Sequence, residues 1–191
     1  MSNLRKKRIL ITGAAGFIGF HLCNKLLKRK NIKLFGIDNL NSYYDVRLKK
    51  NRLRILKEYS KDFIFYKIDL RNQKKLNENF RQNKYDIVIN LAAQAGVRYS
   101  ITHPREYIDS NIIGFYNLLE VSTKYKVKHF MFASTSSVYG DNKKMPLKEN
   151  FNTNKPLSLY AATKSSNEAL AHANSNIHKI PTTGLRFFTV Y

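Results

Sequence analysis

Tyr160 and Lys164 are four positions apart, and their side chains form the pair in this sequence best suited to moving a proton. On a helix, that spacing places both side chains on one face. A free phenol has a pKa of about 10 and is a poor base at neutral pH. A neighbouring ammonium group favours the phenolate and lowers that pKa. The pair therefore indicates acid–base chemistry at an oxygen atom, although Tyr-x-x-x-Lys also occurs by accident and needs supporting context.

Part of that context is the run of hydroxyl residues Ser134-Thr135-Ser136-Ser137, which ends a predicted strand. A hydroxyl at that place can share a hydrogen bond with a substrate oxygen and with the phenol of Tyr160. The other interpretation of the run is helix capping or turn formation. Its position at the carboxyl end of a central strand favours a functional role.

The glycines at positions 13, 16 and 19 follow a predicted strand and open a predicted helix. In such a unit they allow a tight turn, a close approach of the backbone to a pyrophosphate and close packing of the helix. The helix N-terminus adds free N–H groups and a positive dipole for the phosphates. A glycine-rich turn without a ligand is the alternative, but the strand and the helix around it favour a dinucleotide site.

Asp38 ends the second predicted strand, where a carboxylate accepts hydrogen bonds from the adenosine ribose hydroxyls. Because a carboxylate repels a 2′-phosphate, Asp38 favours NAD over NADP. The segments Asp69-Leu70 and Leu91-Ala92-Ala93 close the next two strands and would lie at the adenine edge and beside the cofactor. In sheets of this kind, ligands bind at the carboxyl ends of the strands.

Apolar runs of strand length alternate with stretches of helical period along the chain. The predicted strands are residues 8–12, 33–37, 63–68, 86–91, 128–133 and 182–188. The predicted helices are residues 17–30, 46–59, 72–82, 106–125 and 159–178. This alternation predicts an α/β fold, a Rossmann-like, doubly wound parallel sheet with helices on both faces. Residues 140–157 form a long loop without periodicity, either a lid over a site or a solvated excursion.

With 191 residues, 43% of them apolar, the chain is long enough for one domain with a proper core. The single cysteine, Cys23, excludes an internal disulfide and indicates a reducing, cytoplasmic compartment; we expect it to be buried by packing. The chain has no apolar run of about 18 residues, so no membrane span is predicted. The five histidines lack paired ligand spacing, so no metal site is predicted.

The formal net charge of +21 is the unusual feature of the composition. Such a charge suggests nucleic acid or an anionic membrane surface as a partner. The basic residues are spread over many segments, however, and the motifs of nucleic-acid recognition are absent, so nucleic acid is not expected as a partner. Residues 5–8 resemble the start of a secretory signal, but a strand followed by the glycine turn explains more of the residues.

The chain resembles the extended short-chain dehydrogenase/reductase superfamily, and an ordered set of residues carries the resemblance: Thr12–Gly19, Asp38, Asp69, Leu91–Ala93, Thr135, Tyr160 and Lys164. Within this superfamily it is most similar to the NAD-dependent nucleotide-sugar epimerases and dehydratases, and specifically to UDP-glucuronate 4-epimerases. Three stretches carry that finer resemblance: Asp38–Val46, Ala92–Ser100 and Leu185–Tyr191. The resemblance implies NAD as the cofactor and a UDP-sugar as the substrate.

The resemblance also implies a role for each residue. Tyr160 would take the proton of the sugar 4-hydroxyl, Thr135 would orient that hydroxyl, and Lys164 would hold the nicotinamide ribose and lower the phenol pKa. The cofactor would contact Gly13, Ala15, Gly16, Phe17, Ile18, Gly19, Asp38, Asn39, Asn41, Ser42, Asp69, Leu70, Leu91, Ala92, Ala93, Tyr160 and Lys164. The substrate would contact Arg98, Ser136, Ser137 and Thr189.

These roles imply conversion of UDP-glucuronate to UDP-galacturonate through a 4-keto sugar. Relatives that decarboxylate usually carry Glu at the position of Ser137, and relatives that dehydrate usually carry Asp-Glu at Ser136-Ser137, so the hydroxyls here favour simple epimerisation. The alternatives are a UDP-hexose 4-epimerase, a nucleotide-sugar dehydratase and a non-catalytic NAD-binding fragment.

The resemblance finally implies how the domains are organised. Residues 1–191 would form the NAD-binding Rossmann domain, and the C-terminal substrate domain of the family is largely absent. We therefore expect weak NAD binding and no catalysis from this length of chain alone, and a homodimer for the full-length enzyme.

Overall fold

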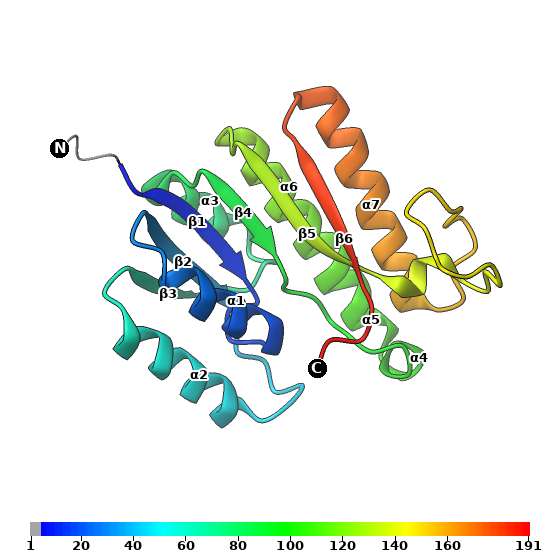
Figure 1. Cartoon of the computed structure of the whole chain (residues 1–191), viewed down its shortest axis with the longest axis horizontal. Coiled ribbons are helices and arrows are strands. Elements are labelled where there is room, and N and C mark those ends of the chain that lie inside the picture. The colour runs from blue at the N-terminus through cyan, green and yellow to red at the C-terminus, as the bar shows by residue number, and fades with distance from the viewer. Residues whose placement is uncertain (1–4) are drawn as a thin grey trace.

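The computed structural model describes residues 5–191, and within that range six strands form one sheet. The strands are β1 (Lys7–Thr12), β2 (Ile32–Asp38), β3 (Phe63–Lys67), β4 (Ile87–Asn90), β5 (His129–Thr135) and β6 (Thr182–Phe187). Their order across the sheet is β3-β2-β1-β4-β5-β6, and every neighbouring pair is parallel (Figure 1). The chain direction across the sheet reverses between β1 and β4, which opens a crevice at their carboxyl ends.

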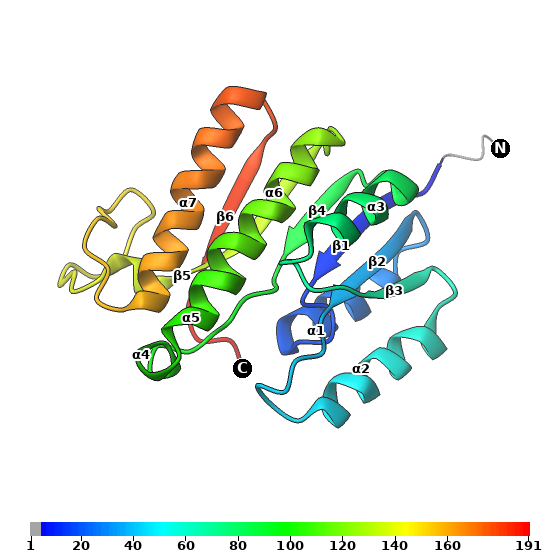
Figure 2. The same ribbon diagram turned by 180° about the vertical axis from the view of Figure 1, so that it is seen from behind.

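Seven α-helices and two helical segments of other types connect the described strands. The α-helices are α1 (Phe17–Leu27), α2 (Val46–Tyr59), α3 (Gln73–Asn83), α4 (Tyr99–Thr102), α5 (Pro104–Tyr107), α6 (Phe115–Lys124) and α7 (Leu159–His178). The segments are a π-helix, η1 (Ile108–Gly114), and a 3₁₀ helix, η2 (Ser136–Tyr139). Helices α1 and α2 pack on one face of the sheet, whereas α3, α6 and α7 pack on the other, which is seen from behind in Figure 2.

The alternation of side chains along the central strands builds one core on each face of the sheet. Leu10 of β1 and Phe35 of β2 point towards α3 and α6, while their neighbours Ile9, Ile11 and Leu34 point towards α1 and α2. Because successive residues of a strand face opposite sides, strands covered on both faces need apolar residues at nearly every position. This arrangement confirms the predicted doubly wound α/β fold.

Polar side chains at the helix starts explain why two predicted helices have the predicted bounds. The Asp45 carboxylate accepts a hydrogen bond from the Arg47 backbone N–H at the start of α2. The Ser158 hydroxyl accepts one from the Ala161 backbone N–H at the start of α7. Such N-caps satisfy backbone donors that have no partner inside the helix. Helix α7 therefore begins at Leu159, one residue before the catalytic candidate Tyr160.

The helix predicted for residues 106–125 is present as an uninterrupted helical run over residues 104–124, but the prediction missed the π-helix in its middle. The chain forms α5, then the π-helical turn η1, and only then α6, while the short helix α4 precedes them. In η1, the Asn111 side chain is buried and pairs with the Gln94 backbone: its Oδ1 accepts from the Gln94 N–H at 2.8 Å, and its Nδ2 donates to the Gln94 carbonyl at 3.0 Å. π-helical turns are frequent at functional sites, and this one ties a helix to the loop that follows β4.

Residues 140–157 contain no helix or strand in the structure, as predicted. The loop lies beside α7 and β6, where the Glu149 carbonyl accepts a hydrogen bond from Arg186 (Figure 1). None of its residues lines the cleft described below, which argues against a lid in this arrangement. Among the described residues, none of the helices is long and apolar enough to cross a membrane.

Candidate functional site

A cleft of about 430 Å³ lies at the carboxyl ends of the strands, where the fold predicts a ligand site. Most of the sequence-predicted cofactor and catalytic residues line it: Gly13, Gly16, Phe17, Ile18, Gly19, Asp38, Asn39, Asn41, Asp69, Leu70, Leu91, Ala92, Ala93, Thr135, Tyr160 and Lys164. They come from loops after five strands and from α7, so tertiary folding brings them together.

The glycine turn after β1 has a geometry that larger residues could not adopt. Gly13 has a φ of +69°, and a Cβ on it would lie 2.8 Å from the Ala92 backbone nitrogen. A Cβ on Gly19 would collide with the Gly13 carbonyl. Helix α1 starts directly after Gly16, so its first N–H groups face the cleft floor. The turn thus has the geometry that the glycine spacing predicted, and its role as a phosphate site remains a prediction.

Asp38 connects two of the loops around the cleft. Its Oδ2 accepts a hydrogen bond from the Ala15 N–H at 3.1 Å, and its Oδ1 accepts one from the Leu40 N–H at 2.9 Å. Each carboxylate oxygen has a second lone pair that remains for a ribose hydroxyl. Ala15 itself is buried and does not line the cleft, so it acts on the site through Asp38.

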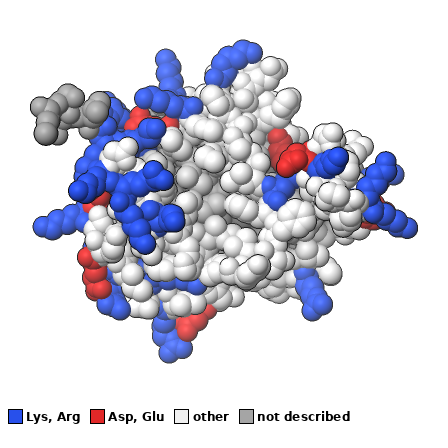
Figure 3. All heavy atoms as spheres, in the orientation of Figure 1, with Lys and Arg blue, Asp and Glu red and all other residues white. Residues whose placement is uncertain are grey.

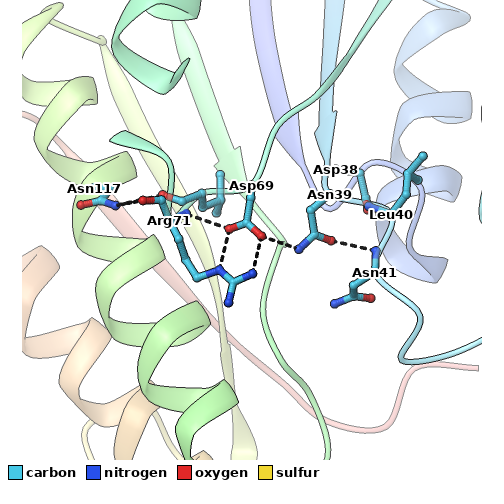
Figure 4. A network of polar contacts seen from close by, with 8 residues as sticks. Asp38, Asn39, Leu40, Asn41, Asp69, Arg71 and Asn117 are labelled. Carbon is cyan, nitrogen blue, oxygen red and sulfur yellow. Dashed lines mark hydrogen bonds and ion pairs between the residues drawn. The ribbon is translucent and has the colours of Figure 1, made fainter. Parts of the chain in front are cut away.

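Asp69, after β3, is held as a carboxylate by a polar network (Figure 4). Arg71 donates from Nε to Asp69 Oδ1 at 2.9 Å and from a terminal nitrogen to Oδ2 at 2.8 Å, while Asn39 Nδ2 donates to Oδ2 at 3.0 Å. Burial opposes the charge, but the hydrogen bonds from Arg71 and Asn39 outweigh it and lower the pKa of Asp69 to about 2. The sequence pointed to Asp69 and missed its partner Arg71.

Lys49 is a cleft residue that the sequence reasoning missed. It is 4% exposed, and its Nζ donates to the Asn41 carbonyl at 2.9 Å and to Asn41 Oδ1 at 2.6 Å. The ammonium group also lies 4.2 Å from the ring centre of Tyr44. Burial lowers the pKa of Lys49. A signal was present, because Lys49 shares the apolar face of its helix with Leu53 and Leu56.

The reactive end of the cleft contains Thr135, Tyr160 and Lys164. Lys164 is 3% exposed, its Nζ donates to the Ala133 carbonyl at 2.9 Å, and burial lowers its pKa to about 8. Burial raises the pKa of Tyr160, and a hydrogen bond with Thr135 lowers it in part. The resemblance led us to expect a phenol pKa lowered by Lys164; in this structure, burial is the larger effect on both groups.

Six of the predicted ligand-contacting residues do not line the cleft: Ala15, Ser42, Arg98, Ser136, Ser137 and Thr189. Arg98 and Thr189 are exposed, and Ser137 is tied to Thr135 through its backbone N–H at 3.2 Å. Instead, Phe188 and Val190, on either side of Thr189, line the cleft beyond the end of β6. The predicted substrate contacts of these residues remain predictions.

In the described part of the chain, the remaining titratable groups do not form a second candidate site. No group of three or more His, Cys, Asp and Glu side chains among residues 5–191 could hold a metal ion. Cys23 is buried, as expected, and burial raises its pKa to about 12. Lys and Arg side chains cover several parts of the face in Figure 3 and gather towards the end where β1–β3 lie, while the centre of that face is largely uncharged.

The parallel sheet and the glycine turn are typical of dinucleotide-binding α/β proteins, and the same cleft contains the partly buried Tyr160 and the buried Lys164. The chain belongs to the NAD dependent epimerase/dehydratase family, whose family model matches residues 9–191. This confirms the family that the sequence motifs indicated.

Curated relatives and solved structures agree with this assignment. The chain is 52% identical to protein CapI of Staphylococcus aureus over 96% of its own length and 54% of the relative. It is 45% identical to a probable UDP-glucuronate 4-epimerase of Rhizobium meliloti, over 96% of the chain and 53% of that relative. A crystal structure of UDP-glucuronic acid 4-epimerase from Bacillus cereus, in complex with UDP-glucuronic acid and NAD, superposes with a TM-score of 0.88 at 39% identity.

That superposition covers 96% of the chain and 57% of the Bacillus cereus protein. The chain thus spans about half the length of the relatives it matches.

Proposed function

We propose that the cleft binds NAD and that the full-length protein is a UDP-sugar 4-epimerase acting on UDP-glucuronate. The observation that carries the proposal is the position of Tyr160 and Lys164 in the same cleft as the glycine turn and Asp38. Relatives named as UDP-glucuronate 4-epimerases, at 45% and 46% identity, support the substrate. The structure of a UDP-glucose 4-epimerase from Thermotoga maritima, at 33% identity, makes a neutral UDP-hexose the main competitor.

The residues present fit a dinucleotide. The space beside Gly13, which a Cβ would fill, and the start of α1 suit a pyrophosphate. Asp38 and Asp69 line the cleft, their carboxyl oxygens suit ribose hydroxyl and adenine amino donors, and Asp69, with its pKa of about 2, is anionic at neutral pH. Bound there, NAD would supply a reversible hydride acceptor for C4 of the sugar.

Residues of the chain itself transfer the proton of the sugar 4-hydroxyl. Tyr160 removes the proton of the 4-hydroxyl as the sugar is oxidised and returns a proton when the 4-keto sugar is reduced on its other face. Tyr160 and Lys164 lie one helical turn apart on α7, so a cationic Lys164 would favour the phenolate form of Tyr160. With its pKa lowered by burial to about 8, Lys164 still carries its proton at neutral pH. Thr135 orients the hydroxyl.

The hydroxyls of Ser136 and Ser137 support epimerisation over decarboxylation or dehydration. Neither can act as a carboxylic acid or carboxylate base, while both can donate hydrogen bonds to a carboxylate on the sugar. The cytoplasmic location and the homodimer also remain predictions.

The test incubates the full-length protein with NAD and UDP-glucuronate and follows the anomeric protons of the sugar by NMR. We expect UDP-galacturonate to appear, and Tyr160→Phe to abolish its formation while NAD binding persists. Conversion of UDP-glucose but not UDP-glucuronate would show that the protein is a 4-epimerase whose substrate is UDP-glucose. A persistent keto-deoxy sugar would instead identify a dehydratase.

A further inference from the structure

The loop between β2 and α2, residues 39–45, reaches across the cleft through the side chain of Tyr43. The Tyr43 hydroxyl donates a hydrogen bond to the Ala95 carbonyl at 3.1 Å, and its ring lies 5.0 Å from that of Tyr99. Ala95 and Tyr99 follow β4, and the glycine turn after β1 lies between the ends of β2 and β4. Tyr43 lines the cleft and is 44% exposed, so the contact lies at the rim.

On the other side of this contact, the segment that contains Ala95 and Gly96 is held by Tyr107. Tyr107 is fully buried, and its hydroxyl lies 2.7 Å from the Ala95 carbonyl oxygen and 2.5 Å from that of Gly96. Gly96 has a φ of +97°, and a Cβ on it would lie 3.0 Å from the Tyr43 hydroxyl oxygen. A glycine at this position therefore lets the loop approach Tyr43 closely. The Ala95 carbonyl, which accepts from the Tyr43 hydroxyl, is thus also held by a contact that does not involve Tyr43.

The loop that carries Tyr43, residues 39–45, is held by hydrogen bonds both before and after this residue. Before it, Asn39 donates to Asp69, and Lys49 donates to Asn41. After it, the Tyr44 hydroxyl donates to the Ala15 carbonyl at 3.4 Å. The two adjacent tyrosines therefore make different contacts: Tyr44 holds the loop to the glycine turn, whereas Tyr43 spans the cleft.

We propose that Tyr43 is a gate at the cofactor cleft and sets how fast the dinucleotide is exchanged. This inference rests on the proposed binding of NAD. The contact is made between two parts of the chain, and in this proposal it re-forms once the dinucleotide has entered, so it stabilises the free and the NAD-bound protein equally and does not change the affinity. A dinucleotide has to displace the contact both to bind and to leave. Removing it should therefore raise the association and dissociation rates by the same factor and leave Kd unchanged.

The experiment compares wild-type full-length protein with Tyr43→Phe, which removes the hydroxyl and keeps the ring, and with Tyr43→Ala, which removes both. Association of NADH is followed by stopped-flow fluorescence, and its release is followed by displacement with excess NAD. We expect both rates to rise about fivefold in Tyr43→Phe, the factor of one ordinary hydrogen bond. Loss of the ring contact with Tyr99 as well should bring the Tyr43→Ala increase to the order of thirtyfold. Kd should stay within about twofold throughout.

Tyr59→Phe is the matched control, because Tyr59 is 53% exposed at the end of α2 and does not line the cleft. Its rates should equal those of the wild type. Unchanged rates in Tyr43→Phe would overturn the gate. A rise in the dissociation rate alone, with a matching rise in Kd, would also overturn it and would show that Tyr43 contacts the dinucleotide directly. A wild-type protein that binds neither NADH nor NAD would overturn the proposed function itself.

Discussion

The two ends of the cleft stabilise their titratable groups in opposite ways. At the nucleotide end, after β2 and β3, hydrogen bonds from Arg71 and Asn39 keep Asp69 ionised, with a pKa of about 2. At the reactive end, near β5 and α7, burial dominates: it raises the pKa of Tyr160 and lowers that of Lys164 to about 8. The charged form is therefore favoured for Asp69, whereas burial favours the neutral forms of Tyr160 and Lys164.

Under the proposed function, this difference separates the residues that recognise the dinucleotide from those that carry out the reaction. A carboxylate whose pKa lies far below neutral keeps its charge and offers a constant acceptor to ribose or adenine donors. A lysine whose pKa lies near neutral can change its charge during a reaction at little cost. Under the proposed function, the cleft therefore combines Asp69, an acceptor that stays charged, with two groups whose protonation can change during the reaction.

The largest expected effect is at the reactive end. Tyr160→Phe removes the hydroxyl that exchanges the proton, so we expect a loss of epimerase activity of about a thousandfold. The affinity for NADH, measured by fluorescence titration, should change by less than threefold, because the nucleotide end is untouched. Substantial residual turnover would show that another group moves the proton.

Gly13→Ala should break the nucleotide end. The new Cβ would lie 2.8 Å from the Ala92 nitrogen at a φ of +69°, so the turn has to shift. We expect about 2 kcal/mol of lost stability in urea unfolding, the usual cost of such strain. We also expect at least about a hundredfold weaker NADH binding, since the displaced turn no longer presents its N–H groups. Unaltered NADH affinity would remove the glycine turn from the proposed site.

Lys164→Met tests whether burial of the Lys164 ammonium group lowers its pKa and destabilises the folded state. In the folded state the pKa of Lys164 is about 8, below its usual value of 10.5, so the unfolded state binds the proton more tightly. Folding is therefore penalised below pH 8, by about 3 kcal/mol, and the penalty disappears as pH rises from 8 to 10.5.

Replacement by Met removes this penalty and loses a hydrogen bond to Ala133 worth about 1 kcal/mol. We therefore expect the variant to be about 2 kcal/mol more stable at pH 7 in urea unfolding. The gain should shrink at pH 10. A variant less stable than the wild type at both pH values would contradict a protonation penalty.

Asp69→Asn should have the smallest effect. The folded-state pKa of about 2 lies below the usual 3.8, so the wild type gains stability above about pH 4 and loses it as pH falls towards 2. Because the side chain is 28% exposed and its partner Arg71 is 46% exposed, solvent screening limits the gain to about 1 kcal/mol. Urea unfolding at pH 7 and pH 2.5 should show a difference at the first pH that is clearly smaller at the second.

Much of the fold and part of the site follow from local patterns. The bounds of α2 and α7 were predicted as found, because apolar periodicity and the capping residues Asp45 and Ser158 are encoded within a few positions. The helix predicted over residues 106–125 is present, but the π-helical segment η1 within it was not predicted. There the reason is tertiary, since Asn111 turns inward to pair with the backbone of Gln94.

The sequence by itself determined the family, the strand-turn-helix unit around Gly13 and the Tyr160–Lys164 pair, since these depend on spacing within single elements. Only the tertiary structure decided which side chains meet across the sheet: Arg71 with Asp69, Lys49 with Asn41 and Tyr43 with Ala95. Long side chains of these kinds are usually solvent-exposed, and no local pattern encodes which partner they reach. It also decided that Lys164 is buried against Ala133, and burial is what sets its protonation state.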